Sequence, residues 1–247
     1  MRFDVLHKKW HSVIMFHEIE RQVLVIQVHS YTLLKAKERK PTMDRVTEKL
    51  IRELRKYSTP ELCDGAIEYH TMDYHITEHI TDKRIVGRAY TVKPPKGVSG
   101  IVPDAILAME PGQILVIAGE GYGQGSYWGD HRSICAKMKG AEGIIIDGAF
   151  RDLEGCREAG IPLFATNVTC GSCKKDREGE LNVPVICGGV EVCPGDFIVA
   201  DCNGIIVMKE EEIPGILERA QAKIEAEQYT IRRMKETGEI IPKVIRR

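Results

Sequence analysis

Two short apolar runs next to glycine constrain the fold of this chain more than any other feature. Residues 114–118 and 143–148 are almost entirely aliphatic or glycine. An apolar run without alternation predicts a strand covered on both faces. Helices are predicted after each run, at about 128–139 and 151–159. Strands that alternate with helices pair in parallel, so this pattern predicts an α/β fold.

The second half of the chain predicts strands without helices between them. Glycine and proline turns separate short β-branched runs at 183–187, 190–192, 197–201 and 204–208. These runs predict a β-rich second layer beside a mixed central sheet. From about Ile213, apolar side chains at helical spacing predict a long C-terminal helix. Such a stripe packs either in the core or against another subunit.

The region before the sheet predicts two helices. Residues 44–57 carry an apolar stripe. Ser58 begins a second helix, which is expected to run to about Tyr69. Its hydroxyl cap, early proline and nearby glutamate are typical of a helix start.

The first 42 residues depart from this regular pattern. They hold four of the eight histidines and one of the two tryptophans. A basic, polar connector then precedes Met43. We predict an N-terminal extension at 1–42 and one domain at 43–247. The extension is either an arm that contacts another subunit or the product of an upstream start, with Met43 as the candidate translation start.

Charge and cysteine content exclude several classes of protein. The formal net charge of −1 argues against broad binding to nucleic acid, which needs a basic face. The eight cysteines lie mostly in apolar runs, which indicates reduced thiols in a cytoplasmic protein. Cys170 and Cys173 have zinc-knuckle spacing but lack a second such pair. No run reaches the roughly 18 apolar residues of a membrane span.

A glycine-rich segment is the first candidate for chemistry. Four glycines alternate between Gly119 and Gly125, after a predicted strand and before a predicted helix. The dinucleotide-binding spacing fails because position 126 is serine. The alternative is a turn that lets the backbone approach a small ligand. The next helix would direct its free amides at Asp130, His131 and Arg132 toward an anion.

The second candidate is Arg151 and Asp152, directly after a buried strand. The carboxyl end of such a strand is where α/β folds bind ligands. Arg151 suits an anionic oxygen and Asp152 a hard cation. The alternative, of equal weight, is that Arg151 caps a helix or pairs with a surface acid and that Asp152 is a helix N-cap. Because adjacent side chains point in different directions, a salt bridge between the two is not required.

Several motifs occur in the order that is typical of one known family. The chain resembles the regulators of ribonuclease activity A and the class II 4-hydroxy-4-methyl-2-oxoglutarate/4-carboxy-4-hydroxy-2-oxoadipate aldolases. The resemblance covers about 44–236 and rests on residues 58–64, 85–92, 118–129, 143–152, 160–165 and 182–190, followed by 194–196 and 201–204. It implies a swivelling α/β/β domain, a homotrimer or homohexamer, and active sites between subunits.

The resemblance also implies a reaction. Aldolases of this family bind a divalent metal, usually Mg²⁺, with Mn²⁺ as the alternative. They cleave small 2-oxo acids to pyruvate and decarboxylate oxaloacetate, both through pyruvate enolate. By this resemblance Asp152 is the metal ligand and Arg151 contacts the 2-oxo oxygen. A cation and a guanidinium at that oxygen would stabilise the developing enolate charge.

The remaining site residues are also implied by the resemblance. The resemblance places the binding site for the substrate's carboxylate after Gly129, where it consists of backbone amides around His131 and Arg132. We call this site the carboxylate cradle. Asp130 matches an acidic residue that works through metal-bound water.

One position departs from the aldolase pattern. Where the aldolases carry an acid three residues after the metal aspartate, this chain has Gly155, with Glu154 one place early. One residue is about 100° of helical rotation, so Glu154 is directed elsewhere. The family also borrows an acid from a neighbour's C-terminal helix, for which Glu225 and Glu227 are the candidates.

Three functions follow as hypotheses. The leading one is a metal-dependent aldolase or decarboxylase acting on small 2-oxo diacids. The second is a protein that inhibits a ribonuclease by binding it. The third is a related metal lyase on an unknown sugar acid, suggested by Gly155. No motif for a methyl donor is present.

Overall fold

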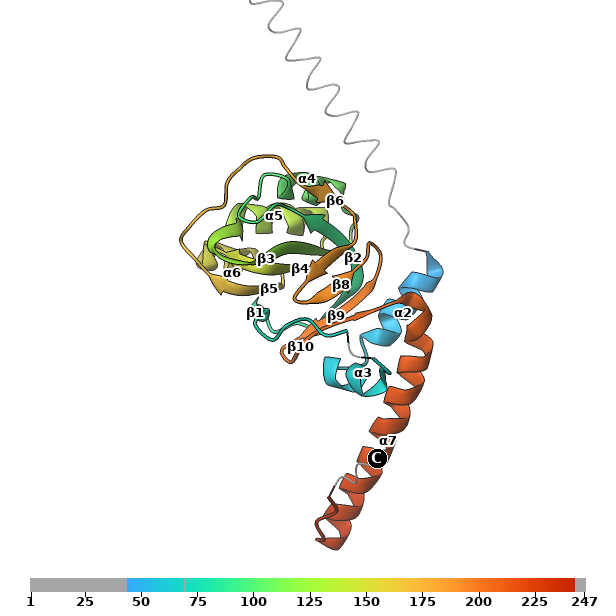
Figure 1. Ribbon diagram of the computed structural model, residues 1–247. Coiled ribbons are helices and arrows are strands. Elements are labelled where there is room, and N and C mark those ends of the chain that lie inside the picture. The colour runs from blue at the N-terminus through green and yellow to red at the C-terminus, as the bar shows by residue number, and fades with distance from the viewer. Residues whose placement is uncertain (1–43, 69, 243–247) are drawn as a thin grey trace, which may run out of the picture. The chain divides into compact units, whose positions relative to one another are not determined.

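The computed structural model describes residues 44–68 and 70–242 (Figure 1). The N-terminal extension predicted at 1–42 and the candidate start Met43 lie outside the described residues. From Asp44 onward the described chain is one compact unit.

A mixed sheet forms the centre of this unit. Four parallel strands lie side by side, and antiparallel strands extend them at both edges. The order across the sheet is β1 (Thr77–Ile80), β5 (Leu163–Val168), β4 (Gly143–Phe150), β3 (Ile114–Trp128), β2 (Ile85–Lys93), β9 (Phe197–Asp201) and β10 (Gly204–Met208), with β6 (Glu180–Leu181) paired to β2. The predicted mixed α/β fold is confirmed.

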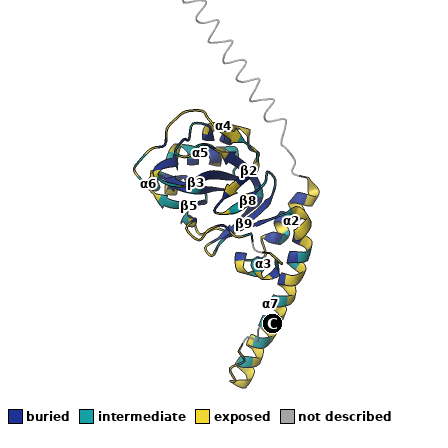
Figure 2. Cartoon of the chain, in the orientation of Figure 1, coloured by how far each residue is buried: buried dark blue, intermediate teal, exposed yellow. Residues whose placement is uncertain are grey.

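The central strands are apolar at successive positions because both faces of the sheet are covered. Leu115 and Ile117 of β3 pack in one cluster with α4 (Val102–Ala108), α5 (Asp130–Lys139) and α6 (Leu153–Ala159). Their neighbours on β3 face the other side and pack with the hairpin of β7 (Val185–Cys187) and β8 (Val190–Val192). Figure 2 shows this buried sheet in dark blue.

The predicted β-rich second layer is present as the β7–β8 hairpin. These two strands pair antiparallel as a separate sheet. The other two runs of that region, β9 and β10, extend the central sheet instead, because β9 pairs with β2.

The turn predicted for the glycine-rich segment between Gly119 and Gly125 is wrong. These residues continue strand β3, which runs through Trp128, and the following helix begins at Asp130. The glycines mark bulges rather than a turn, since the β3–β4 register shifts between Ile117 and Ser126. Glu120 and Gly121 have φ of 54° and 64°, and the Gly121 N–H donates to Asp147 Oδ1 at 3.0 Å. Irregular residues of this kind bend a strand without ending it.

Two helices precede the sheet, α2 (Arg45–Leu54) and α3 (Thr59–Gly65). The predicted start of α3 is confirmed, because the Ser58 N–H donates to Glu61 Oε2 at 2.6 Å. The helix ends at Gly65 rather than Tyr69. A Cβ at Gly65 would lie 2.2 Å from the Ile216 carbonyl oxygen, so glycine permits close packing against the C-terminal helix.

The long C-terminal helix follows the short turn η1 (Glu210–Glu212) and is α7 (Ile213–Thr237). Its first two turns are anchored by Ile213, Ile216 and Ala220, which are buried. Beyond Ala220 the helix is partly or fully exposed, as the teal and yellow ribbon of α7 in Figure 2 shows. The predicted stripe therefore packs in the core only at its start, and Ile231 is 44% exposed. Among the described helices, none combines the length and apolar character that crossing a bilayer requires.

Candidate functional site

A small pocket of about 140 Å³ lies where β3 and β4 end and α5 begins. It is lined by the six residues predicted from the sequence, Gly129, Asp130, His131, Arg132, Arg151 and Asp152, together with Ser126, Trp128 and Lys175. Two larger hollows, of about 480 and 430 Å³, lie beside α3 and are lined by none of these residues.

Strand pairing brings the two predicted segments together. Trp128 is the last residue of β3 and pairs with Phe150, the last residue of β4. Gly129 and Arg151 therefore follow side by side, and the Arg151 N–H donates to the Trp128 carbonyl at 3.1 Å. Carboxyl ends of neighbouring parallel strands form the usual ligand edge of an α/β sheet.

Asp152 has an unusual backbone conformation. Its φ of 56° and ψ of 47° are left-handed, which is uncommon for a residue other than glycine and is concentrated at functional sites. It is the N-cap residue of α6, but its side chain makes no capping hydrogen bond. Instead, Asp152 Oδ2 accepts from Arg151 Nε at 3.1 Å. The two side chains thus meet in an ion pair, although adjacent residues were expected to diverge.

Gly129 provides room for that carboxylate. A Cβ at this position would lie 2.6 Å from Asp152 Oδ2. Its φ of −165° is extended and open to any residue. Glycine is needed here for space and not for its conformation.

Asp130 and His131 begin α5. Asp130 Oδ1 accepts from the His131 N–H at 2.6 Å, so this carboxylate already covers one amide of the predicted cradle. The His131 ring is exposed, and its Nδ1 lies 3.8 Å from Cys135 Sγ.

Arg132 uses its side chain to hold the pocket wall. The guanidinium donates to the Tyr127 carbonyl and, at 2.9 Å, to the Ser99 carbonyl. Burial lowers the pKa of this guanidinium, and the nearby Arg151 lowers it further. The Arg132 side chain is therefore engaged elsewhere, and its backbone amide is the part of this residue that could belong to the cradle implied by the resemblance.

Two residues of the pocket region were not predicted from the sequence. Ser172 accepts from Arg151 Nη1 at 2.7 Å, and Lys175 Nζ lies 3.4 Å from Ser99 Oγ. Burial lowers the pKa of the Lys175 ammonium, and the positive charges of Arg132 and Arg151 lower it further. Isolated β-bridges pair Ser172 with Ser126 and Lys174 with Val98, and these pairings position residues 172–175 beside the pocket. No spacing in the sequence indicates the pairings.

The donor set suits a hard divalent cation. Asp130 and Asp152 supply carboxylate oxygens to one pocket. Mg²⁺ keeps several waters and is usually held by one or two carboxylates, so two are enough. Within the described ranges, no group of three or more His, Cys, Asp or Glu side chains is arranged for a metal. Cys170 is exposed whereas Cys173 is buried, which gives the zinc-like spacing no support.

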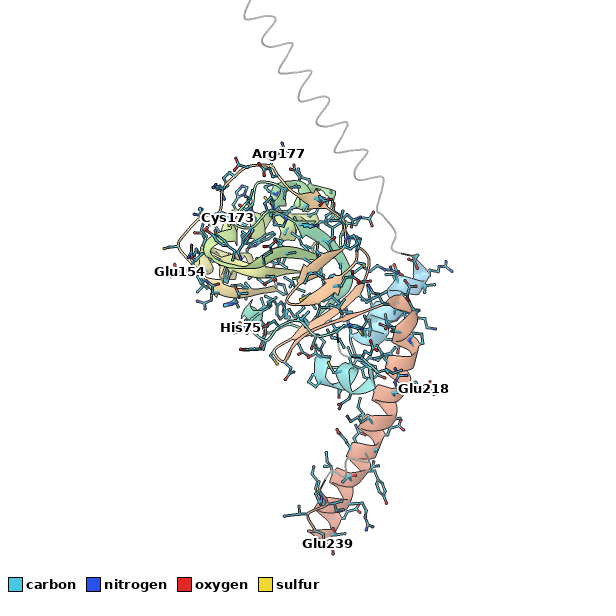
Figure 3. The ribbon with its side chains drawn as sticks, in the orientation of Figure 1. His75, Glu154, Cys173, Arg177, Glu218 and Glu239 are labelled. Carbon is cyan, nitrogen blue, oxygen red and sulfur yellow. The ribbon has the colours of Figure 1, made fainter. Side chains whose placement is uncertain are left out.

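Gly155 lies beside Asp130, at the position where the resemblance leads one to expect an acid. A Cβ there would be 2.6 Å from Asp130 Cβ and 3.0 Å from its Oδ2. Glu154 is exposed and projects from α6 at the outer side of the chain (Figure 3). Glu225, on α7, accepts a hydrogen bond from Gln221, and neither Glu225 nor Glu227 lines this pocket.

Comparisons with known proteins show the family of this chain. The family model described as RraA-like, Aldolase/RraA, matches residues 59–207. An uncharacterised protein of Methanocaldococcus jannaschii is 38% identical over 169 residues, which cover 68% of this chain and 80% of that protein. The 4-hydroxy-4-methyl-2-oxoglutarate aldolase of Thermus thermophilus is 33% identical over 127 residues, covering 51% and 77%.

A solved structure shares the fold. It is the RNA-processing inhibitor RraA from Thermus thermophilus, which superposes with a TM-score of 0.59 at 30% identity. The match covers 62% of this chain and 93% of that one.

Proposed function

The chain belongs to the Aldolase/RraA family, and on that premise we propose that it is a divalent-metal-dependent lyase that releases pyruvate from small 2-oxo diacids. One observation carries the proposal: Asp152, Asp130 and Arg151 converge in a single pocket at the start of α5. The aldolase from Thermus thermophilus supports the same reaction class.

Asp152, with Asp130 nearby, would hold the cation. Mg²⁺ is the preferred candidate because one or two carboxylates are enough to hold it. When bound, such a cation supplies Lewis-acid stabilisation of negative charge at the substrate oxygens. Asp152 Oδ2 also holds Arg151 by the 3.1 Å ion pair, and Ser172 holds the same guanidinium from the other side. Arg151 is thereby fixed in direction before substrate arrives, and such preorganisation is what makes a charge effective in catalysis.

Each remaining residue has a role in the cleavage of 4-hydroxy-4-methyl-2-oxoglutarate. The start of α5 binds the carboxylate next to the oxo group, through the Arg132 amide and the helix dipole. Arg151 stabilises the enolate oxygen. Asp130 accepts the hydroxyl proton through a water, the C3–C4 bond breaks, and its electron pair forms the enolate. Return of this proton from Asp130 to C3 through the water then gives pyruvate, and the C4 fragment leaves as a second pyruvate.

The test is pyruvate release by the full chain. The protein is incubated with Mg²⁺ and either oxaloacetate or 4-hydroxy-4-methyl-2-oxoglutarate, and pyruvate is measured by coupled reduction to lactate. We expect turnover that EDTA abolishes and excess Mg²⁺ restores. Pyruvate formation equal with and without EDTA would refute metal dependence.

A second function, inhibition of a ribonuclease by direct binding, is favoured by Gly155. Without an acid at that position the pocket has fewer carboxylates than the resemblance leads one to expect, and RraA from Thermus thermophilus is an RNA-processing inhibitor. This hypothesis predicts inhibition of RNA cleavage by a partner ribonuclease that Asp152→Asn leaves intact. Inhibition that disappears in Asp152→Asn would instead tie the effect to the pocket.

A further inference from the structure

A thiol, an ammonium and a carboxylate meet at the turn between β8 and β9, and none of them lines the pocket at the start of α5. Asp196 Oδ2 accepts from the Lys209 ammonium at 2.7 Å and from the Cys193 N–H at 2.8 Å. Burial acts to lower the pKa of the Lys209 ammonium, but hydrogen bonds to Asp196 and to the Cys193 side chain raise it overall. The Cys193 sulfur therefore lies within hydrogen-bond reach of the Lys209 nitrogen.

Strand pairing holds these three residues together. Met208, the last residue of β10, pairs with Phe197, the first residue of β9. Lys209 and Asp196 are the next residues at this end of the ladder, so their side chains meet there. The Lys209 N–H donates to Glu212 Oε2 at 3.0 Å, which fixes the backbone at the same point. The fold thus keeps the sulfur and the nitrogen in contact.

Accessibility distinguishes Cys193 from most other thiols of the chain. Cys193 is half-buried and the Lys209 side chain is 36% exposed, so a small oxidant can reach the pair. Burial raises the pKa of four other thiols, which keeps them protonated and inert. They are Cys63, Cys156, Cys173 and Cys187. Cys202 is exposed, but its sulfur contacts the Asn203 amide and not an ammonium.

The neighbours of Cys193 direct an oxidised sulfur toward Lys209. Peroxide converts a reactive thiol to a sulfenic acid, which condenses with a second thiol or with a backbone nitrogen. The next backbone nitrogen belongs to Pro194 and carries no hydrogen, so it cannot form such a bond. The Lys209 nitrogen is the hydrogen-bonded alternative.

We propose that Cys193 is a site of reversible oxidation by hydroperoxides, and that Lys209 Nζ captures its sulfenic acid as a sulfenamide cross-link. The site is independent of the lyase pocket and of its substrate. The link ties the β8–β9 turn to the segment that leads through η1 into α7.

The cross-link forms in two balanced steps. Hydrogen peroxide first oxidises the thiol by two electrons: the O–O bond breaks, an S–O bond forms, and water leaves. The Lys209 ammonium then passes one proton to Asp196, from which it reaches solvent. The free nitrogen attacks the sulfur, the S–N bond forms as the S–O bond breaks, and hydroxide leaves as water with a second proton from that nitrogen.

The test is peptide mapping of the full chain after treatment with hydrogen peroxide. Cleavage before aspartate places Cys193 in a peptide that ends at Gly195 and Lys209 in a peptide that begins at Asp201. We expect these two peptides to be joined, with two hydrogen atoms fewer than their sum, and dithiothreitol to release them. Because a cross-link restricts the unfolded chain, Tm should rise on oxidation and return on reduction.

Three variants locate the bond. Cys193→Ser removes the link. Lys209→Arg keeps a positive charge beside Asp196 but offers no nucleophilic amine, so the link is lost and dimedone labels the accumulating Cys193 sulfenic acid. Cys202→Ser is the matched control and keeps the link, because that exposed thiol lies in the same peptide as Lys209. Unlinked peptides in the oxidised wild type, a link retained in Lys209→Arg, or a link lost in Cys202→Ser would overturn the proposal.

Discussion

Gly155 packs directly against Asp130, so that a Cβ at position 155 would come within 2.6 Å of Asp130 Cβ. Asp130 occupies the space next to α6 in which a larger residue at 155 would have to fit. Asp130 thus fills the space that an acidic side chain at position 155 would need.

Gly155→Ala should destabilise the protein although it replaces glycine within a helix. Helix propensity alone favours alanine by about 1 kcal/mol. Contact with Asp130 Cβ should outweigh this gain, since overpacking typically costs about 1–3 kcal/mol. The free energy of unfolding is measured in urea. Gly215→Ala in α7 is the matched control, because its new Cβ would meet only the end of the flexible Arg219 side chain. Stabilisation by both substitutions would contradict this packing.

Gly129→Ala should impair activity with little change in stability. The new Cβ would displace Asp152 Oδ2 from a distance of 2.6 Å, while the extended backbone accepts alanine. Misplacement of a reacting group by about 1 Å can cost roughly 100-fold in rate. Steady-state kcat/KM for pyruvate release is the measurement, again with Gly215→Ala as control. Activity of Gly129→Ala close to that of the wild type would show that the space beside Asp152 is not critical.

The central sheet was predictable because its signal is local. Leu115 and Val116 are adjacent on β3 and are buried against opposite layers, so the run must be apolar throughout. The capped start of α3 at Ser58 is likewise encoded within four residues.

The site was only partly predictable because several of its contacts are non-local. The glycines between 119 and 125 carry turn-like signals, yet pairing with β4 keeps them in the strand. Ser172 and Lys175 lie some 20 residues after Arg151 and reach the pocket through bridges to distant segments. The resemblance singled out Asp152 as a candidate, but its left-handed backbone and its pairing with Arg151 became visible only in three dimensions.

Asp201 should make stability depend on pH in the acid range. Burial acts to raise the pKa of this carboxyl, but hydrogen bonds from Thr59 and Asn203 lower it overall. A folded-state pKa below that of the unfolded chain stabilises the fold above about pH 4, and the stabilisation is lost as pH falls through the folded value. Asp201→Asn should therefore cost about 1–3 kcal/mol at pH 7, with a smaller difference from wild type below pH 4. The test is the free energy of unfolding in urea, measured at several pH values, with the exposed Glu191→Gln as control. A loss of stability in Asp201→Asn that does not change with pH would contradict the prediction.

The outer part of α7 should be covered by another subunit. Tyr229 and Ile231 are 60% and 44% exposed, and a helix without packing is marginal in water. We propose that this part of the helix lies in the interface of a homotrimer or homohexamer. Light scattering should give that mass for the wild type and a smaller species for the double variant Tyr229→Ser, Ile231→Ser. A monomeric wild type with full helix content by circular dichroism would contradict the proposal.

The most direct test of the lyase account compares kcat/KM for pyruvate release from 4-hydroxy-4-methyl-2-oxoglutarate in wild type, Asp152→Asn and Glu154→Gln, all with Mg²⁺. Asp152 lines the pocket, whereas Glu154 is a nearby exposed acid outside it. The account predicts a loss of roughly 100-fold or more in Asp152→Asn, as for removal of a key electrostatic group, and wild-type activity in Glu154→Gln. Equal activity in all three proteins, or no turnover by the wild type above the Asp152→Asn level, would contradict it.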